Sequence, residues 1–387
     1  MHYCTYRRAT SVHGLVLTGA LAALGAAFPN AVIGQNTTDG ATLRYGGTPE
    51  SIFSAACSTC HGSDGRGRSV DQLAFETPPP DFTDCNFASR EPDPDWYAII
   101  HEGGPVRGFD RHMPAFGDAL TEDELLAALA HVRTFCSDDA WPRGDLNLPL
   151  AMYTEKAFPE DEIVVKTFMN AEGNNAFEQE FIYEKRFGPR SQIEIALPWV
   201  REDIGPPSGT EGGIGDLALA FKHAISHSLD SGSILSIGGE LKLPTGDENR
   251  GFGKGTVVLE PYILFGKLLS PDTFIQFHGA LELPTESGFE DELVLRTAIG
   301  RTWTTGAGGF GRAWTPMLEV LGAKELAGGA SAEWDLVPQF QVSLNTRQHI
   351  LANFGLRVPV TDSSTRDTQL VFYVLWDWFD GGLTEGW

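Results

Sequence analysis

Hydrophobic and polar residues alternate along most of the chain after residue 160. Between Ile234 and Leu243, for example, leucine and isoleucine alternate with serine, glutamate and lysine. A period of two places successive side chains on opposite faces of an extended strand. About twelve runs of this kind, bounded by turn residues, predict an antiparallel β-domain over residues 160–387.

The period changes to that of a helix in the segment before Cys136. The apolar residues that recur at helical spacing are Leu125, Leu129, Val132 and Phe135. Thr121 and Glu124 have the spacing of a capping box, in which each side chain bonds to the backbone amide of the other residue. We therefore expect a helix that begins at Thr121 and ends near Cys136.

The N-terminus has the parts of an export signal. Arg7 and Arg8 supply positive charge, and a mostly apolar run from Gly14 to Phe28 follows them. This run is too short for a membrane-spanning helix. We assign residues 1–34 to a signal peptide, so the mature chain is exported and Cys4 leaves with the signal.

One short motif carries the chemistry of the first domain. Cys57-Ser58-Thr59-Cys60-His61 has the spacing at which two thiols attach a c-type haem and the histidine binds its iron. A zinc knuckle would need a second Cys/His pair at matching spacing, and none follows. The motif predicts one covalently attached haem c, with His61 as an axial iron ligand.

The remaining cysteines form an even pair. With Cys4 removed and two cysteines on the haem, Cys85 and Cys136 are left in an oxidising compartment, where disulfides persist. We predict a disulfide between them. Two buried free thiols are the alternative.

Residues 46–136 resemble the class I c-type cytochromes in the order of their parts. Ile52 and Phe53, in a helical stretch, precede the haem motif, and Met113-Pro114 precedes the last helix, as in the axial-methionine loop of that family. The resemblance implies an all-α domain whose first and last helices cross. It also implies Met113 as the second iron ligand.

Three histidines compete with Met113 for that position. His101, His112 and His131 all follow the haem motif, and His112 is adjacent to the methionine. The family resemblance favours Met113, which would raise the redox potential relative to two histidine ligands.

Charge restricts the partners of this domain. The chain has a formal net charge of −24, no lysine before Lys156, and acidic stretches at 91–95 and 122–124. Nucleic acid is excluded as a partner, and a docking periplasmic electron carrier should present lysine or arginine. In the alternative interpretation the acidic residues serve solubility alone. Arg107 and Arg111 are candidates for hydrogen bonds to haem propionates.

A segment of weak periodicity separates the two domains. Pro142, Pro149 and Pro159 interrupt it, and we place a linker at residues 137–159. Trp141 near its start predicts a packed strap rather than a free tether.

The alternating pattern fits either a β-sandwich or a membrane barrel. Short turns such as Gly188-Pro189 and Asp230-Ser231-Gly232 alternate along the chain with long connections such as 245–255. Outer-membrane barrels have short periplasmic turns and longer loops outside. The aromatic-rich segment 370–379 and the terminal Trp387 are also typical of such proteins. We therefore favour a transmembrane β-barrel of about 12 strands.

Two short segments and the order of the domains carry further resemblances. Ile214-Gly215-Asp216-Leu217 and Leu243-Pro244-Thr245-Gly246-Asp247 are similar to segments of the outer-membrane family associated with the meta-pathway of phenol degradation. The whole chain resembles the cytochrome–porin fusions of iron-oxidising bacteria, in which a single-haem cytochrome accepts electrons from outside. It departs from them in its complete cytochrome and its smaller barrel.

In the predicted register, charged residues face the inside of the barrel. They are Glu180, Glu194, Glu240, Glu260, Glu282, Lys222, Lys242, Arg296 and Arg357. Carboxylates could pass or bind a metal cation. A network of neutralising ion pairs that fills a small barrel is the favoured interpretation. No hydrolase or nucleotide-binding signature occurs in the sequence.

These features predict a bacterial outer-membrane protein whose cytochrome domain is periplasmic, because an even number of strands returns the chain to its starting side. A domain of about ninety residues is too wide for the lumen and should lie beneath the barrel.

The predicted function is electron transfer between a substrate near or entering through the barrel and periplasmic carriers, with outer-membrane lipid around the barrel. The alternatives are a transporter for small apolar or metal solutes with an accessory cytochrome, and a soluble periplasmic haem enzyme with a β-sandwich domain.

Overall fold

The computed structural model describes residues 47–73, 75, 77–171, 176–203, 209–305 and 308–387. The signal peptide expected at residues 1–34 lies outside these residues, as does residue 46, where the first domain was expected to begin. Within the described part of the chain, no helix is both long enough and apolar enough to cross a membrane.

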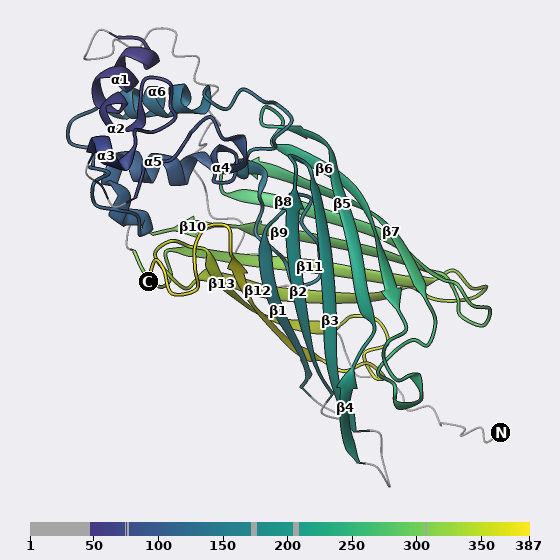
Figure 1. The fold of residues 1–387 in the computed structure, drawn as a ribbon. Helices are drawn as coiled ribbons and strands as arrows, with labels where there is room; N and C mark the ends of the chain where they lie inside the picture. The colour runs from purple at the N-terminus through teal and green to yellow at the C-terminus, as the bar shows by residue number, and fades with distance from the viewer. Residues whose placement is uncertain (1–46, 74, 76, 172–175, 204–208, 306–307) are drawn as a thin grey trace, which may run out of the picture. The chain divides into compact units, whose positions relative to one another are not determined.

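Short helices form the first domain (Figure 1). The α-helices are α1 (Pro49–Ala56), α2 (Ser58–His61), α3 (Val70–Leu73), α4 (Cys85–Ala88), α5 (Asp93–Glu102) and α6 (Glu122–Arg133), and η2 (Gly104–Arg107) is a 3₁₀ turn. Local chemistry sets where the first and last of them begin. Thr48 caps α1 by accepting from the amide of Ser51, and Thr121 and Glu124 form the predicted capping box of α6.

The core of this domain lies between α1 and α6. Ile52 of α1, only 2% exposed, shares one cluster with Leu125 and Leu129 of α6. Phe53 shares a second cluster with Val132. The predicted crossing of the first and last helices is therefore observed, and burial of each such side chain contributes about 1.5–3 kcal/mol to folding.

A disulfide joins Cys85, the first residue of α4, to Cys136 just beyond α6. The two Cα atoms are 5.1 Å apart and the residues are separated by 51 positions. The bond therefore ties the middle of the domain to its last helix.

Replacing Cys85 and Cys136 together by serine should destabilise the helical domain by about 4 kcal/mol, because the open chain regains the entropy of a loop of this length. Thermal unfolding of the full-length protein, followed through the haem absorbance, measures the change. An unchanged unfolding temperature would show that the disulfide contributes nothing to stability.

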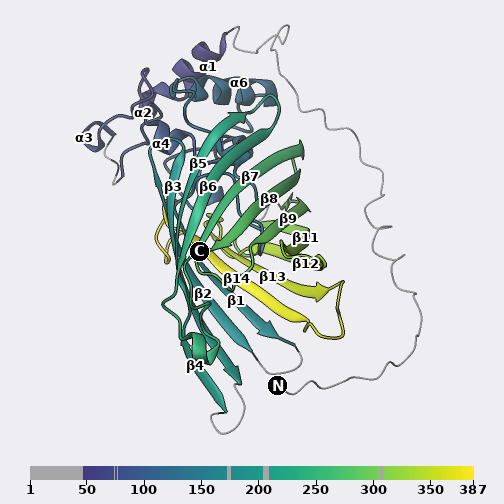
Figure 2. The same ribbon diagram turned by 90° about the vertical axis from the view of Figure 1, so that its right-hand side faces the viewer.

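The rest of the chain forms one antiparallel sheet that closes on itself (Figures 1 and 2). Of the fourteen strands, β4 (Thr210–Ile214) pairs only with β3 and β10 (Trp303–Thr304) only with β11, which leaves a ring of twelve among the described residues. The twelve are β1 (Glu162–Asn170), β2 (Phe177–Phe187), β3 (Ser191–Asp203), β5 (Leu217–Ser228), β6 (Ser233–Leu243), β7 (Val258–Ser270), β8 (Thr273–Pro284), β9 (Glu292–Arg301), β11 (Ala313–Glu325), β12 (Glu333–Ser343), β13 (Ile350–Pro359) and β14 (Gln369–Asp377). Pairing of β1 with β14 closes the ring. The predicted fold, an all-α domain followed by an antiparallel barrel of twelve strands, is confirmed.

Side chains alternate between the outside and the inside of this wall. Large apolar side chains exposed on the strands include Phe181, Ile195, Leu219, Phe221, Ile237, Ile263, Leu281, Leu318, Phe354 and Val374. Buried polar side chains on the same strands include Lys166, Glu184, Lys222, Glu260, Gln276, Glu319 and Asn353. An apolar exterior around a polar interior is the pattern of a transmembrane barrel and the reverse of a soluble β-sandwich. The sandwich alternative is therefore wrong.

The linker lies inside the barrel rather than beside it. Every residue from 148 to 160 except Pro149, Tyr153 and Glu155 is buried, and we call this segment, residues 148–160, the strap. Inward side chains of several strands bond to its backbone carbonyls: Gln276 to that of Pro149, Tyr373 to that of Leu150, Arg296 to that of Tyr153, Lys222 to that of Lys156 and Ser236 to that of Ala157. The predicted packed strap is observed, but its place in the lumen was not anticipated.

Candidate haem site and barrel lumen

The haem motif lies on a short helical turn at the end of α1. Cys57 connects α1 to α2, and Cys60 and His61 lie on α2 itself. Both cysteines are half-buried free thiols. Burial, with a smaller contribution from Cys60, raises the pKa of the Cys57 thiol to about 11. Burial also lowers the pKa of His61 to about 4, so its imidazole is neutral near pH 7 and can donate a lone pair to iron.

The surroundings of His61 fit a residue that completes its bonding with a cofactor. The ring stacks on Phe82, with the ring centroids 4.7 Å apart. Its buried Nδ1 atom has no hydrogen-bond partner among the described residues. Orphaned buried polar atoms are rare in folded proteins, and this one lies beside two thiols at the spacing of haem attachment.

The loop that carries Met113 is held against the helical core. The amide of Gly104 donates to the carbonyl oxygen of Met113 at 3.0 Å. A Cβ atom at Gly104 would lie 2.3 Å from the carbonyl oxygen of Asp110, so this close approach needs glycine. The Met113 side chain packs partly buried against the cluster that contains Ile52 and Leu125. Its role as second iron ligand stays a prediction.

The competing histidines have contacts of their own. His112 is largely exposed, lies 2.7 Å from a carboxylate oxygen of Asp110 and stacks on Phe75. His101 stacks on Tyr97. His131 is half-buried and its ring contacts Phe53.

Arg107 is committed to protein contacts rather than to a propionate. Its buried guanidinium pairs with Asp95 and lies 3.6 Å from Glu91. It also donates to the carbonyl oxygen of Arg347 at 2.8 Å. These partners engage both terminal nitrogens of its guanidinium, while its buried Nε atom has no partner among the described residues. Because both terminal nitrogens are engaged, we no longer assign Arg107 to a haem propionate.

Arginine side chains contact each carboxylate of the acidic stretch 91–95. Arg133 and Arg143 both pair with Asp93, and Arg107 takes the other two carboxylates of the stretch. The sequence could not show this neutralisation, because the arginines come from distant positions. Of the second stretch, Glu122 and Asp123 are exposed.

Buried charge attaches the helical domain to the end of the barrel with the short turns. Arg90 lies 2.5 Å from Asp161, which immediately precedes β1, and both side chains are buried. The Arg90 guanidinium also lies 3.9 Å from the ring centroid of Phe379, beyond β14. Arg347, in the turn between β12 and β13, donates to the carbonyl oxygen of Gly108 at 2.9 Å. These contacts agree with a cytochrome beneath the barrel.

Two carboxyl groups at this junction make its stability depend on pH. Burial, together with Asp380, raises the pKa of Glu91 well above its usual range, and burial raises the pKa of Asp380 to about 6. A carboxyl group whose pKa is higher in the folded state binds more protons there than in the unfolded state. Stability from this pair is therefore present at low pH and is lost as pH rises through about 6.

We expect the unfolding temperature of the helical domain to fall between pH 5 and pH 7.5, and Asp380→Asn to reduce that fall. Circular dichroism of the haem band, followed during heating of the full-length protein, measures the unfolding temperature of the wild type and of the variant at each pH. Asp362→Asn, which alters an exposed carboxylate in a loop at the other end of the barrel, is the matched control. A stability that rises with pH over this range in the wild type would contradict the prediction.

The lumen contains the charged residues expected from the strand register. Those that line a cavity of about 290 Å³ are Glu180, Glu194, Glu240, Glu260, Lys222, Lys242, Arg296 and Arg357. Many are paired: Lys242 lies 2.6 Å from Glu260 and 3.0 Å from Glu282. The expected network of ion pairs is therefore present, although it leaves space unfilled.

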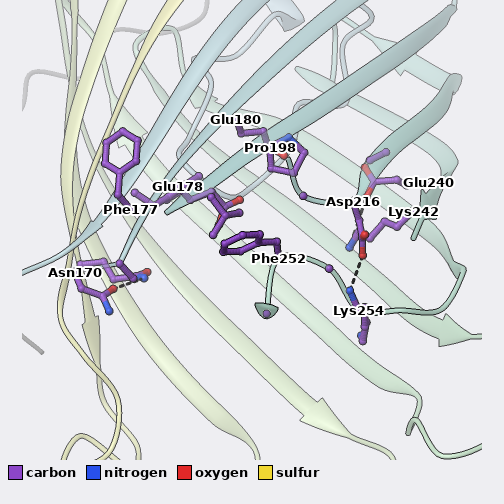
Figure 3. A pocket seen from close by; sticks show the side chains of 18 residues that line it. Asn170, Phe177, Glu178, Glu180, Pro198, Asp216, Glu240, Lys242, Phe252 and Lys254 are labelled. Atoms are coloured by element: carbon purple, nitrogen blue, oxygen red, sulfur yellow. Dashed lines mark hydrogen bonds and ion pairs between the residues drawn. The ribbon is translucent and has the colours of Figure 1, made fainter. Parts of the chain in front are cut away.

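A second cavity, of about 530 Å³, opens at the end of the barrel with the long connections (Figure 3). Phe177 and Phe252 line it together with Glu178 and Glu240, and Asp216 accepts from the backbone amide of Lys254 at 2.7 Å. The two cavities share six lining residues: Phe168, Glu178, Glu180, Glu240, Lys242 and Gln369. They are therefore adjacent parts of one lumen.

Comparison with known proteins covers the two domains separately. Residues 47–132 match the family model described as cytochrome C oxidase, cbb3-type, subunit III. No curated protein matches the sequence.

Several solved structures are similar to the barrel. An outer membrane channel from Pseudomonas putida F1 is 14% identical, with a TM-score of 0.42 and coverage of 59% of this chain and 99% of that one. The KdgM porin is 10% identical, with a TM-score of 0.38 and coverage of 56% and 98%. LpxR from Salmonella typhimurium is 6% identical, with a TM-score of 0.37 and coverage of 56% and 99%. At these TM-scores the likenesses carry no argument about function, and the barrel rests on its own strand pairing.

The chain therefore joins a domain that matches a c-type cytochrome family model to an antiparallel barrel of twelve strands. The donor set fits a covalently bound haem c, which Cys57 and Cys60 would attach and His61 and Met113 would hold by its iron. When bound, the haem supplies one-electron chemistry. The chain's own residues supply the remainder: two thiols, a neutral buried imidazole and a thioether at the edge of an apolar core.

Proposed function

We propose that this protein is an outer-membrane electron-transfer protein. Its barrel receives a small redox substrate from outside the cell, and its single-haem cytochrome exchanges electrons with periplasmic carriers. The apolar exterior of the barrel supports a place in the outer membrane, and the N-terminal export signal supports passage to it.

The observation that carries this proposal is the strap. The two cavities let a small molecule reach the middle of the lumen from the end with the long connections. There it meets a buried segment whose backbone is bonded to side chains of six strands. The cytochrome is attached at the opposite end. In this proposal the strap keeps solutes on its outer side. Only electrons then pass from the lumen to the cytochrome.

The periplasmic partner should be a carrier with a basic surface. Glu122 and Asp123, at the exposed start of α6, are adjacent acidic residues that could meet such a carrier. Attraction between such surfaces weakens with salt, so the rate of electron transfer should fall as ionic strength rises.

Proteoliposomes test the function directly. The full-length protein is inserted with its long connections outward, and an impermeant ferrous chelate is added outside while haem absorbance is followed. A dye trapped inside the vesicles reports leakage. Prompt haem reduction without loss of dye supports the proposal. The Met113→Ala variant should show a changed rate of haem reduction.

Two outcomes would contradict the proposal. Reduction seen only after detergent opens the vesicles would show that no electron path crosses the barrel. Reduction that keeps pace with dye loss would show that solute passes the strap, which is the behaviour of the transporter alternative.

A further inference from the structure

Three carboxylates meet in the lumen beside the strap. Glu155 belongs to the strap, Glu184 to β2 and Glu194 to β3, and one oxygen atom of each lies within 4.8 Å of the others. Glu184 and Glu194 are directly opposite each other in the β2–β3 ladder, where like charges repel. The cluster therefore needs a compensating positive charge or a proton.

The nearby cationic side chains compensate the cluster only in part. They are Lys166, Lys222 and Arg296. Arg296 also donates to the carbonyl oxygen of Tyr153 at 3.0 Å. Lys166 lies 3.4 Å from Glu155, while Lys222 donates to the carbonyl oxygen of Lys156 at 2.8 Å. Glu184 accepts from the side-chain amide of Gln192 at 2.8 Å. Within the described part of the chain, the side-chain carboxylate of Glu194 makes neither a hydrogen bond nor an ion pair.

A buried histidine lines the same cavity. His278 of β8, together with Glu155 and Glu194, lines the lumen cavity of about 290 Å³. It is 2% exposed, and neither of its ring nitrogens has a hydrogen-bond partner among the described residues. Buried polar side chains nearly always have partners. Its ring contacts that of Tyr262, with the ring centroids 5.6 Å apart, but no contact among the described residues uses its nitrogen atoms. His278 is not one of the three residues whose ligand atoms lie within 4.8 Å of one another, so it is a fourth donor that faces the same cavity.

We propose that this cluster binds one divalent transition-metal cation inside the barrel. Carboxylates suit hard divalent cations and imidazole suits first-row transition metals, and Mn²⁺ is a cation that accepts both. For comparison, ligand oxygens on opposite sides of the small divalent cation Mg²⁺ are about 4.2 Å apart. The observed spacing of up to 4.8 Å therefore requires only small side-chain movements.

The position of the site would let a cation reach it from outside and would let the bound cation stabilise the strap. Glu180 and Glu240 line both lumen cavities, so carboxylates continue from the outer cavity towards the cluster. A bound cation offsets the repulsion between Glu184 and Glu194. It also joins the strap to the wall through Glu155, so occupancy of the site should strengthen closure of the lumen.

Binding of Mn²⁺ to the full-length protein in detergent tests the site. The room-temperature electron paramagnetic resonance signal of free Mn²⁺ falls as the ion binds, at an ionic strength of about 0.15 M to suppress surface binding. We expect saturable binding of one ion per chain, with displacement by Zn²⁺. Because this readout does not involve electron transfer, its failure is distinct from a failure of the proposed function.

Three variants test whether the bound Mn²⁺ occupies the proposed site. Glu194→Gln and His278→Gln should each weaken Mn²⁺ binding by about tenfold or more. Glu260→Gln is the matched control, since Glu260 faces the same lumen but is paired with Lys242, and its binding should match the wild type. Unchanged heat-dependent gel mobility shows that each barrel is folded. Absence of saturable binding, or wild-type binding by Glu194→Gln or His278→Gln, would overturn the proposal.

Discussion

Replacing Cys57 and Cys60 together by serine should remove covalently bound haem completely while the barrel still folds. The thioether bonds of a c-type haem form from cysteine thiols, and these are the two free cysteines of the described chain. The barrel has its own core, with Met152, Val337 and Tyr373 in one cluster, so it does not need the haem. Haem-dependent peroxidase staining of a denaturing gel measures attachment, and heat-dependent mobility reports on the barrel.

Two companion variants separate attachment from ligation. Serine at both Cys85 and Cys136 should leave the haem stain intact, because these thiols are already joined to each other. Met113→Ala should also keep the stain but lower the midpoint potential, on the order of 0.1 V, through loss of the thioether ligand. Covalent haem in the Cys57/Cys60 variant would disprove the attachment site. An unchanged potential in Met113→Ala would assign the second ligand to another residue.

Replacing Glu319 by alanine should loosen the strap and make the barrel leak. Glu319, on β11, is fully buried. Its carboxylate accepts from the backbone amides of Met152, Tyr153 and Thr154 at 2.7–3.2 Å and from the side chain of Gln339. Each buried donor left without a partner costs about 1–3 kcal/mol. The strap should therefore lose about 3 kcal/mol or more of the free energy that holds it in the lumen.

Conductance across planar bilayers measures this release. We expect larger and more frequent openings in Glu319→Ala than in the wild type. Glu319→Gln should be intermediate, because it keeps one acceptor oxygen but loses the charge. Glu325→Gln, at the exposed end of the same strand, is the matched control. Wild-type conductance in Glu319→Ala, with a barrel shown to be folded, would mean that the strap does not close the lumen.

Much of the fold could be predicted because it depends on local patterns. The capping box at Thr121 and Glu124 acts within one helical turn, and it marks the start of α6 in the structure as in the sequence. The period of two between Ile234 and Leu243 likewise follows from the geometry of a single strand. The haem motif is equally local, since its chemistry requires two thiols and an imidazole on one short turn.

The features that escaped prediction depend on residues far apart in the chain. Arg107 reaches Arg347 across 240 positions, and Glu319 reaches Thr154 across 165. No periodicity within either segment indicates such a partner. The sequence of a proline-rich linker does not show whether the linker crosses solvent or the lumen of a barrel. The polar side chains that bond to its backbone come from the barrel wall, which exists only once the ring of strands has closed.

The sequence by itself determined the two domains, the alternation of inward and outward side chains and the apolar exterior, since each follows from spacing along one segment. Only the tertiary structure decided that the strap fills the lumen, that the acidic stretch 91–95 is neutralised, and that Glu155, Glu184 and Glu194 meet. The reason is physical. A buried charge or backbone amide must find a partner wherever the fold places one, and closure of the ring of strands determines which distant residues come within reach.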